Sequence, residues 1–242
     1  MRITADSMSS LLGKRMFLLF LALEMASGGL RVLFLSASER TDTYLRIHPL
    51  KGLETFFLDR NFGDSPRRLE EFLQEPVPNL FYLASPRSLN PRWQDIEPLT
   101  TTSGYDVVVS EYHGTTQPLT FYLLPPNIRY LRNNRPRTVW TNAIHPVIAG
   151  LSTELITPER VSIYQDILGK PVQFLPWEPA LTLIPYEQDL LDYYASRQDS
   201  GYLQAIRRIS CSLLPAELVA ERAPENGIWQ RFRERRKNHG HR

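Results

Sequence analysis

The sequence predicts an α/β domain with a doubly wound, mainly parallel sheet. Short, continuous apolar runs recur along the 242-residue chain, and segments with helical signals lie between them. Such runs are typical of parallel strands that are covered on both faces, and their alternation with helices indicates a wound sheet. With 42% hydrophobic residues, the chain can bury a sizeable core. We expect this domain over 1–215 and a basic helix or tail over 216–242.

The first elements have the order of a nucleotide-binding α/β domain. A short strand at the N-terminus leads into a loop that ends at Gly13-Lys14, and an apolar helix follows over Met16–Ala26. Its apolar residues surround the helix, so we expect it to be buried. Gly28-Gly29 supplies a left-handed C-cap, and Arg31–Ser36 reads as a central parallel strand.

The later elements continue this alternation. Thr157-Pro158 is a strong helix start, and Gly169 is a matching stop. Ser65-Pro66 is a similar start. We predict further strands at Leu80–Ala84, Val107–Val109, Thr138–Thr141 and Val172–Leu175, and helices at Ser65–Gln74 and Thr157–Leu168.

Composition narrows the class of protein. The formal charge is only +2, so the body has no strong field for nucleic acid or membrane. Cys211 is the only cysteine, which excludes an intrachain disulfide and fits a reducing cytoplasm. The five histidines show no metal-ligand spacing. Lys14, Arg15 and the apolar run after them also allow a secretory leader, but Glu24 interrupts that run and a strand follows at once.

The order and spacing of the segments resemble the ParA/MinD family of deviant Walker A P-loop ATPases. The matching pieces are GK before the first helix, RVLFLS, YDVVVSEYHG, TVWTNA and LGKPVQFLPWEPAL. In the family these correspond to a KGGxGKT loop, a strand ending in Asp, YDxVIID, a strand ending in Asn, and LGxPVxxxIPYD. The likeness covers roughly 1–210. It implies a P-loop NTPase-like fold of ParA/MinD type, with ATP as cofactor.

The P-loop departs from the family pattern and is degenerate. Gly13 and Lys14 match, whereas the family's leading lysine falls on Ser9 and its loop glycines on Ser10 and Leu11. Arg15 stands in place of the magnesium-binding hydroxyl. The resemblance therefore implies that Gly13, Lys14 and Arg15 hold phosphate and that Lys14 is catalytic. An exposed basic pair at the start of a buried helix is the alternative. Magnesium-assisted hydrolysis is not expected.

The resemblance places one retained carboxylate at the sheet edge. Glu111 follows YDVVVS where the family has its second magnesium-associated acid, so it is the second candidate catalytic residue. The alternative is a solvated Glu after a strand. Ser36 and Ser38 fall where the family has acidic residues, and Asp42 lies in the loop after them as a weaker candidate.

A nucleotide base would meet residues after two later strands. Asn142 matches the family's base-contacting asparagine, and Pro176 matches the segment that packs on the base. Trp140 and Trp177 add stacking surface. An ordinary turn Asn and loop Pro are the alternative interpretation.

The C-terminus carries a strong local charge. The fourteen residues Trp229–Arg242 hold six Lys or Arg and one acid, Glu234. We expect contact with the phosphates of nonspecific DNA or with acidic lipid headgroups, unless the segment is a plain solvated terminus. The candidate contact residues are Arg231, Arg233, Arg235, Arg236 and Lys237.

These observations predict a partitioning, positioning or assembly protein that acts as a dimer on a macromolecular protein partner. Its ATPase activity is expected to be weakened or lost, which makes it a pseudo-ATPase. One alternative is a nucleotide-sugar glycosyltransferase-like Rossmann domain, although 242 residues leave little room for its second domain. Another is a nucleic-acid-binding module that acts through the basic tail.

Overall fold

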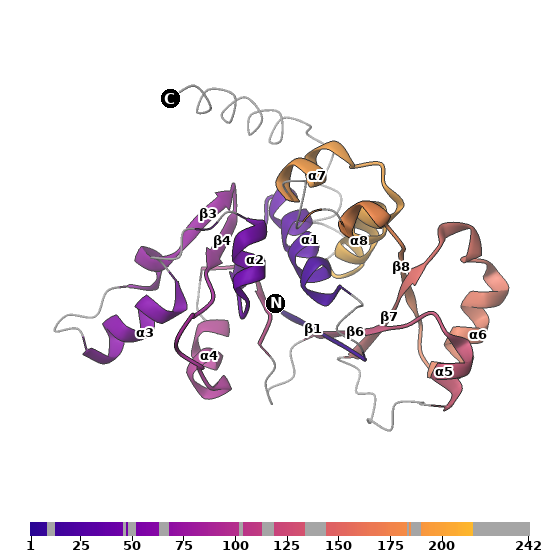
Figure 1. The fold of residues 1–242 in the computed structure, drawn as a ribbon, viewed down its shortest axis with the longest axis horizontal. Coiled ribbons are helices and arrows are strands. Elements are labelled where there is room, and N and C mark those ends of the chain that lie inside the picture. Colours follow the sequence, from indigo (N-terminus) through magenta and orange to yellow (C-terminus); the bar gives the residue numbers. More distant parts are fainter. Residues whose placement is uncertain are drawn as a thin grey trace.

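The strands in the described part of the chain form one eight-stranded sheet with helices on both faces (Figure 1). The computed structural model describes residues 1–8, 13–45, 47, 52–62, 68–101, 104–112, 119–133, 144–182, 184 and 190–214. The strand order is β3-β4-β2-β5-β1-β6-β7-β8, and only the β3–β4 pair is antiparallel. The strands are β1 (Arg2–Ser7), β2 (Val32–Leu35), β3 (Gln74–Val77), β4 (Leu80–Leu83), β5 (Val107–Ser110), β6 (Leu119–Leu124), β7 (Ile144–Leu151) and β8 (Gln173–Pro176).

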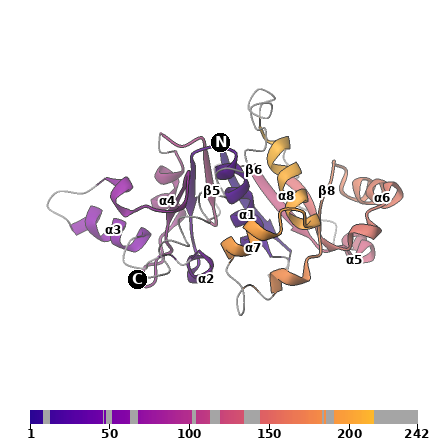
Figure 2. The ribbon, with the colours of Figure 1, turned by 90° about the horizontal axis from the view of Figure 1, so that it is seen from above.

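The helices divide between the two faces of the sheet (Figure 2). Helices α1, α7 and α8 cover one face; α3 and α4 cover one end of the other face, and α5 and α6 cover its opposite end. The α-helices are α1 (Lys14–Ser27), α2 (Glu39–Tyr44), α3 (Leu53–Phe62), α4 (Trp93–Thr100), α5 (Ile128–Asn133), α6 (Pro158–Leu168), α7 (Leu190–Ser196) and α8 (Gly201–Ser212). Short 3-10 turns lie at Leu69–Phe72, Thr153–Leu155 and Pro179–Thr182.

Alternation of side chains along the strands sorts the core into layers. In β2, Val32 and Phe34 join the large cluster beneath α1, whereas Leu33 and Leu35 join the cluster beneath α3 and α4. Successive strand residues point to opposite faces, so a strand that is apolar throughout must be covered on both sides. The continuous apolar runs of the sequence are explained by this double cover.

Helix α1 is enclosed on all sides. Every residue over 17–26 is buried, and Glu24 is the only charged one among them. The sheet covers one side of the helix and α8 the other, and Phe20 packs against the rings of Tyr193, Tyr194 and Tyr202. Glu24 is tolerated because Arg207 Nε and the Tyr194 hydroxyl donate hydrogen bonds to it, at 2.8 and 2.6 Å.

Several predicted elements are confirmed, with small shifts at their ends. The predicted strands at Arg31–Ser36, Leu80–Ala84, Val107–Val109 and Val172–Leu175 correspond to β2, β4, β5 and β8. Helix α6 begins after the Thr157 cap, whose hydroxyl accepts from the Arg160 amide, and it ends at Gly169 with φ +66°. The left-handed residue after α1 is Gly29, at φ +86°, whereas Gly28 is not left-handed.

The predicted helix over Ser65–Gln74 is wrong. Residues 65–67 lie outside the described part, only a 3-10 turn forms over Leu69–Phe72, and strand β3 begins at Gln74. Pro76 has no amide hydrogen and cannot extend a helix, but an edge strand accepts it. Asn79, at φ +67°, then turns the chain back into β4.

Besides β3, strands β6 and β7 of the sheet were not predicted. Strand β6 joins β1 to β7, and β7 begins at Ile144, whereas the predicted strand Thr138–Thr141 lies outside the described residues. Pro146 lies in the part of β7 that pairs with β6 but does not yet pair with β8, whose pairing begins at Val147. Its missing amide hydrogen therefore needs no partner on that side. No helix in the described part of the chain is both long and apolar enough to cross a membrane.

Candidate functional site

The carboxyl ends of β1, β2 and β5 meet beside the start of α1. These strands are parallel neighbours, so their carboxyl ends lie at one edge of the sheet. Such edges are where open α/β sheets bind ligands, above all where the crossovers change direction. Gly13 begins α1 with φ +69°, and its carbonyl accepts from the Phe17 amide at 2.9 Å. A residue with a Cβ would be strained there, so this glycine has a conformational role.

Lys14 and Arg15 occupy the first turn of α1. Lys14 Nζ lies 3.9 Å from the Asp6 carboxylate at the end of β1. The Arg15 side chain is 45% exposed, and its Nε lies 3.7 Å from Glu111 Oε1. The structure thus brings together the predicted residues Gly13, Lys14, Arg15 and Glu111. The amide hydrogens at a helix N-terminus favour an anion at this place.

Glu111 is buried and fully engaged, which excludes the solvated alternative. It follows β5 directly, and its exposed fraction is 7%. Oε2 accepts from the Ala37 amide at 2.8 Å and from Ser36 Oγ at 3.2 Å, and Oε1 accepts from Thr41 Oγ1 at 2.8 Å. One carboxylate therefore ties the end of β5 to the segment after β2 and lies beside α1.

Opposing effects act on the pKa of the Glu111 carboxyl. Burial raises the pKa of its carboxyl above the ordinary value of 4.5, while the Ala37 amide, the Thr41 hydroxyl and Arg15 act to lower it. The burial effect is the largest. A carboxylate without these donors would be much harder to bury. The donors therefore make a buried acid tolerable at this edge.

The sequence did not reveal the hydrogen-bond donors to Glu111, and Asp42 was expected in a loop. Asp42 lies within helix α2 rather than in a loop, and it accepts hydrogen bonds from Tyr82, at 2.9 Å, and from the Ser85 hydroxyl, at 2.6 Å. These contacts fasten α2 to the end of β4, so Asp42 has a structural role in this arrangement. The run of Ser, Thr and Asp over 36–43 was the only available signal, because such residues cap helices.

The structure describes only some of the residues that were predicted to contact a nucleotide base. Pro176 ends β8 at the same edge of the sheet, and the amide of the following Trp177 donates to Leu151 at the end of β7. The Trp177 side chain is 55% exposed. Asn142 and Trp140 lie outside the described residues, and β7 starts after them at Ile144.

Other predicted residues also lie outside the described part. These are Ser9, Ser10 and Leu11 of the P-loop, and the tail residues Arg231, Arg233, Arg235, Arg236 and Lys237. Their predicted contacts stay predictions.

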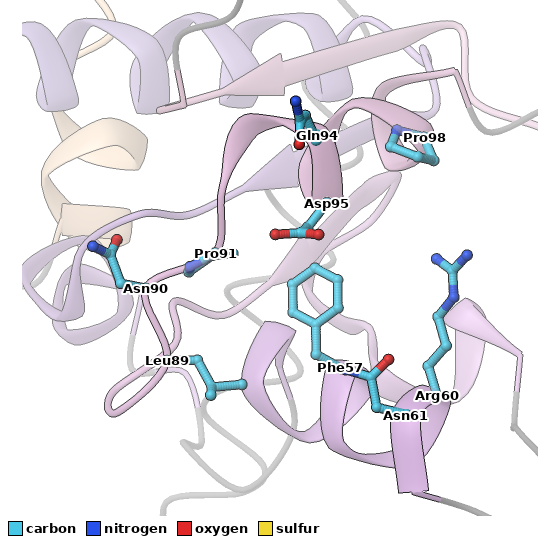
Figure 3. A pocket seen from close by; sticks show the side chains of 9 residues that line it. All are labelled: Phe57, Arg60, Asn61, Leu89, Asn90, Pro91, Gln94, Asp95 and Pro98. Carbon is cyan, nitrogen blue, oxygen red and sulfur yellow. The ribbon is translucent and has the colours of Figure 1, made fainter.

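A separate hollow lies between α3 and the segment that enters α4 (Figure 3). Its volume is about 380 Å³, and it shares no residue with the edge site. The Phe57 ring points from α3 toward Asp95, while Arg60 projects from the same helix as Phe57. Asp95 is already engaged, because it accepts from the Arg92 amide at the start of α4.

Comparison with known proteins identifies the fold. No family model matches the sequence, and no curated protein matches it either. Solved structures do match, and among them is a chain of the MinC:MinD cell division protein complex of Aquifex aeolicus. It is 18% identical, with a TM-score of 0.62 over 88% of this chain and 97% of that one. The fold is that of MinD and ParA ATPases.

Two further structures agree with the MinD/ParA fold. A ParA family ATPase from Chlorobium tepidum TLS is 15% identical, with a TM-score of 0.62 over 86% of this chain and 98% of that one. The septum site-determining protein MinD of Pyrococcus horikoshii OT3, complexed with Mg-ADP, is 17% identical, with a TM-score of 0.60 over 92% and 98%. The expected P-loop NTPase-like fold class is therefore confirmed.

The magnesium ion of that last complex does not fit the residues present here. Both oxygens of Glu111 accept hydrogen bonds, and the Arg15 cation lies beside it. A dication would have to displace these donors and approach a guanidinium. No group of three His, Cys, Asp or Glu residues within the described ranges could hold a metal ion.

Proposed function

We propose that this chain is a partitioning, positioning or assembly protein that retains a nucleotide site but hydrolyses ATP weakly or not at all. The observation that carries the proposal is the edge site, where Gly13, Lys14, Arg15 and Glu111 meet beside the N-terminus of a MinD/ParA-type α1 helix. Lys14 and the first turn of α1 supply the cationic surroundings that a phosphate chain needs.

Weak hydrolysis follows from the same residues. Phosphoryl transfer relies on a metal ion and on groups that orient the attacking water. Arg15 stands where the resemblance expects the metal-binding hydroxyl, and the Ser36 hydroxyl donates to the Ser38 carbonyl and to Glu111. The degenerate P-loop thus keeps groups that attract phosphate and lacks those that activate water.

The proposed partner is a protein, with the chain acting as a homodimer. The MinC:MinD complex is an example of this fold bound to a second protein. The basic tail is a further proposed contact, to nonspecific DNA or to an acidic membrane surface. The glycosyltransferase alternative is less well supported, because it needs a second Rossmann domain. All the strands in the described part of the chain belong to one sheet.

The test is a turnover assay with ATP and magnesium, together with light scattering to measure mass with and without nucleotide. We expect turnover at the level of a Lys14→Ala control and a nucleotide-dependent or constitutive dimer. Lys14-dependent turnover at the rate of an ordinary ATPase of this fold would contradict the pseudo-ATPase proposal. If the protein is a monomer under every condition, the proposed homodimer is wrong.

A further inference from the structure

Arg15 is the least explained residue of the edge site. It is the second residue of α1, so its backbone position is set by a helix that is buried over 17–26. Its guanidinium lies beside Glu111, yet the 3.7 Å separation is too long for a hydrogen bond. Among the described residues, the Arg15 guanidinium makes no hydrogen bond. Its N–H donors are therefore available to a ligand at the sheet edge.

Glu111 restricts where Arg15 can lie. Three donors from the segment after β2 hold the carboxylate, and burial prevents it from rotating into solvent. A fixed anion next to a half-exposed guanidinium keeps that cation at the edge of the sheet instead of letting it extend into water. Glu111 is thus a positioning residue for Arg15.

Arginine and magnesium satisfy phosphate in different ways. A magnesium ion needs oxygen ligands in octahedral geometry, and the buried Glu111 carboxylate already accepts three hydrogen bonds. A guanidinium instead presents a planar set of donors that matches two phosphate oxygens and needs no further ligand. The site has the charge for phosphate without the ligands for a metal.

We propose that Arg15, positioned by Glu111, takes over the charge role of the metal ion, so that the site binds the phosphate chain of a metal-free nucleotide. This inference rests on the proposed nucleotide site. It adds the form of the ligand: ATP or ADP without magnesium. Magnesium bound to the nucleotide competes with Arg15 for the same phosphate oxygens and weakens binding.

Calorimetric titration with ATP, in excess EDTA and in excess magnesium, tests the proposal. The full-length protein should bind ATP in EDTA at least as tightly as in magnesium. Arg15→Ser should weaken binding in EDTA by about tenfold or more, as expected for a lost charge-assisted hydrogen bond. Arg40→Ser is the matched control, because Arg40 is an exposed arginine on the neighbouring helix α2 and should leave the affinity unchanged.

A double-mutant cycle tests the positioning role. In a Glu111→Gln background, Arg15→Ser should cost clearly less affinity than in the wild type, because Arg15 is no longer held in place. Equal costs in the two backgrounds would assign Glu111 a purely structural role and overturn that part of the proposal.

The outcomes separate this inference from the proposed function. Binding only in magnesium would overturn the inference and leave the nucleotide site intact. No binding in either condition would overturn both, and the chain would be a nucleotide-independent scaffold. An Arg15→Ser variant that binds as tightly as wild type in EDTA would also overturn the inference, provided that circular dichroism shows it folded.

Discussion

Truncation of Glu111 is expected to destabilise the fold strongly, although the residue lies at a sheet edge. In Glu111→Ala, the buried Thr41 hydroxyl loses its acceptor, whereas the buried Ser36 hydroxyl keeps the Ser38 carbonyl at 3.1 Å. Each buried donor without a partner costs ~1–3 kcal/mol. Ala37 is exposed, so its amide can bond to water instead. Removal of a buried charge returns part of the loss. We therefore expect the free energy of unfolding to fall by about 1–3 kcal/mol.

Urea denaturation followed by tryptophan fluorescence measures this loss. Glu111→Gln keeps one carbonyl acceptor and should lose about half as much. Glu154→Ala is the matched control, because Glu154 is an exposed carboxylate that accepts from the Ser152 hydroxyl, and its effect should stay within about 0.5 kcal/mol. If Glu111→Ala lowers the free energy of unfolding by less than about 1 kcal/mol, Glu111 does not hold the end of β5 to the segment after β2 as described.

Two further predictions concern pH and the tail. Burial raises the pKa of Glu111 in the folded chain, so the folded state binds the carboxyl proton more tightly than the unfolded chain does. The resulting stabilisation of the fold is complete below the ordinary pKa of 4.5. It is lost as the pH rises through the pKa of the folded state. The unfolding free energy of wild type, measured relative to Glu111→Gln, should therefore decrease over that rise, and a flat difference would contradict the assignment. Replacement of the five basic residues over 231–237 by serine should abolish salt-sensitive binding to nonspecific DNA or acidic vesicles, as followed by fluorescence anisotropy, while the melting temperature stays unchanged. Equal binding by the variant would move the contact surface to the α/β body.

Local signals were sufficient where an element is determined by its own residues. The apolar run after Lys14 predicted α1, because a helix that is enclosed between a sheet and α8 must be apolar all round. Thr157 and Gly169 predicted both ends of α6, since a side-chain cap and a left-handed stop act within one turn. The apolar runs of β2, β4, β5 and β8 were equally clear, because both faces of each strand are covered.

Local sequence signals could not predict which distant segments pair as strands. Pro146 and Gly150 make β7 look unlike a strand, yet β7 pairs with β6 through Pro146 and with β8 only from Val147 onward. Pro76 lies in an edge strand, not in the predicted helix, because β4 provides one antiparallel neighbour. In both cases, which neighbour is present decides whether a missing amide hydrogen has a cost.

The sequence by itself determined the fold class and the presence of Gly13, Lys14, Arg15 and Glu111 as candidates. The tertiary structure decided how they relate. It brought Glu111 next to α1 and surrounded it with donors that lie seventy or more residues away in the chain. The physical reason is that β5 pairs with both β1 and β2. The ends of these neighbouring strands meet at one edge, and only there can a buried acid, its donors and an arginine satisfy one another.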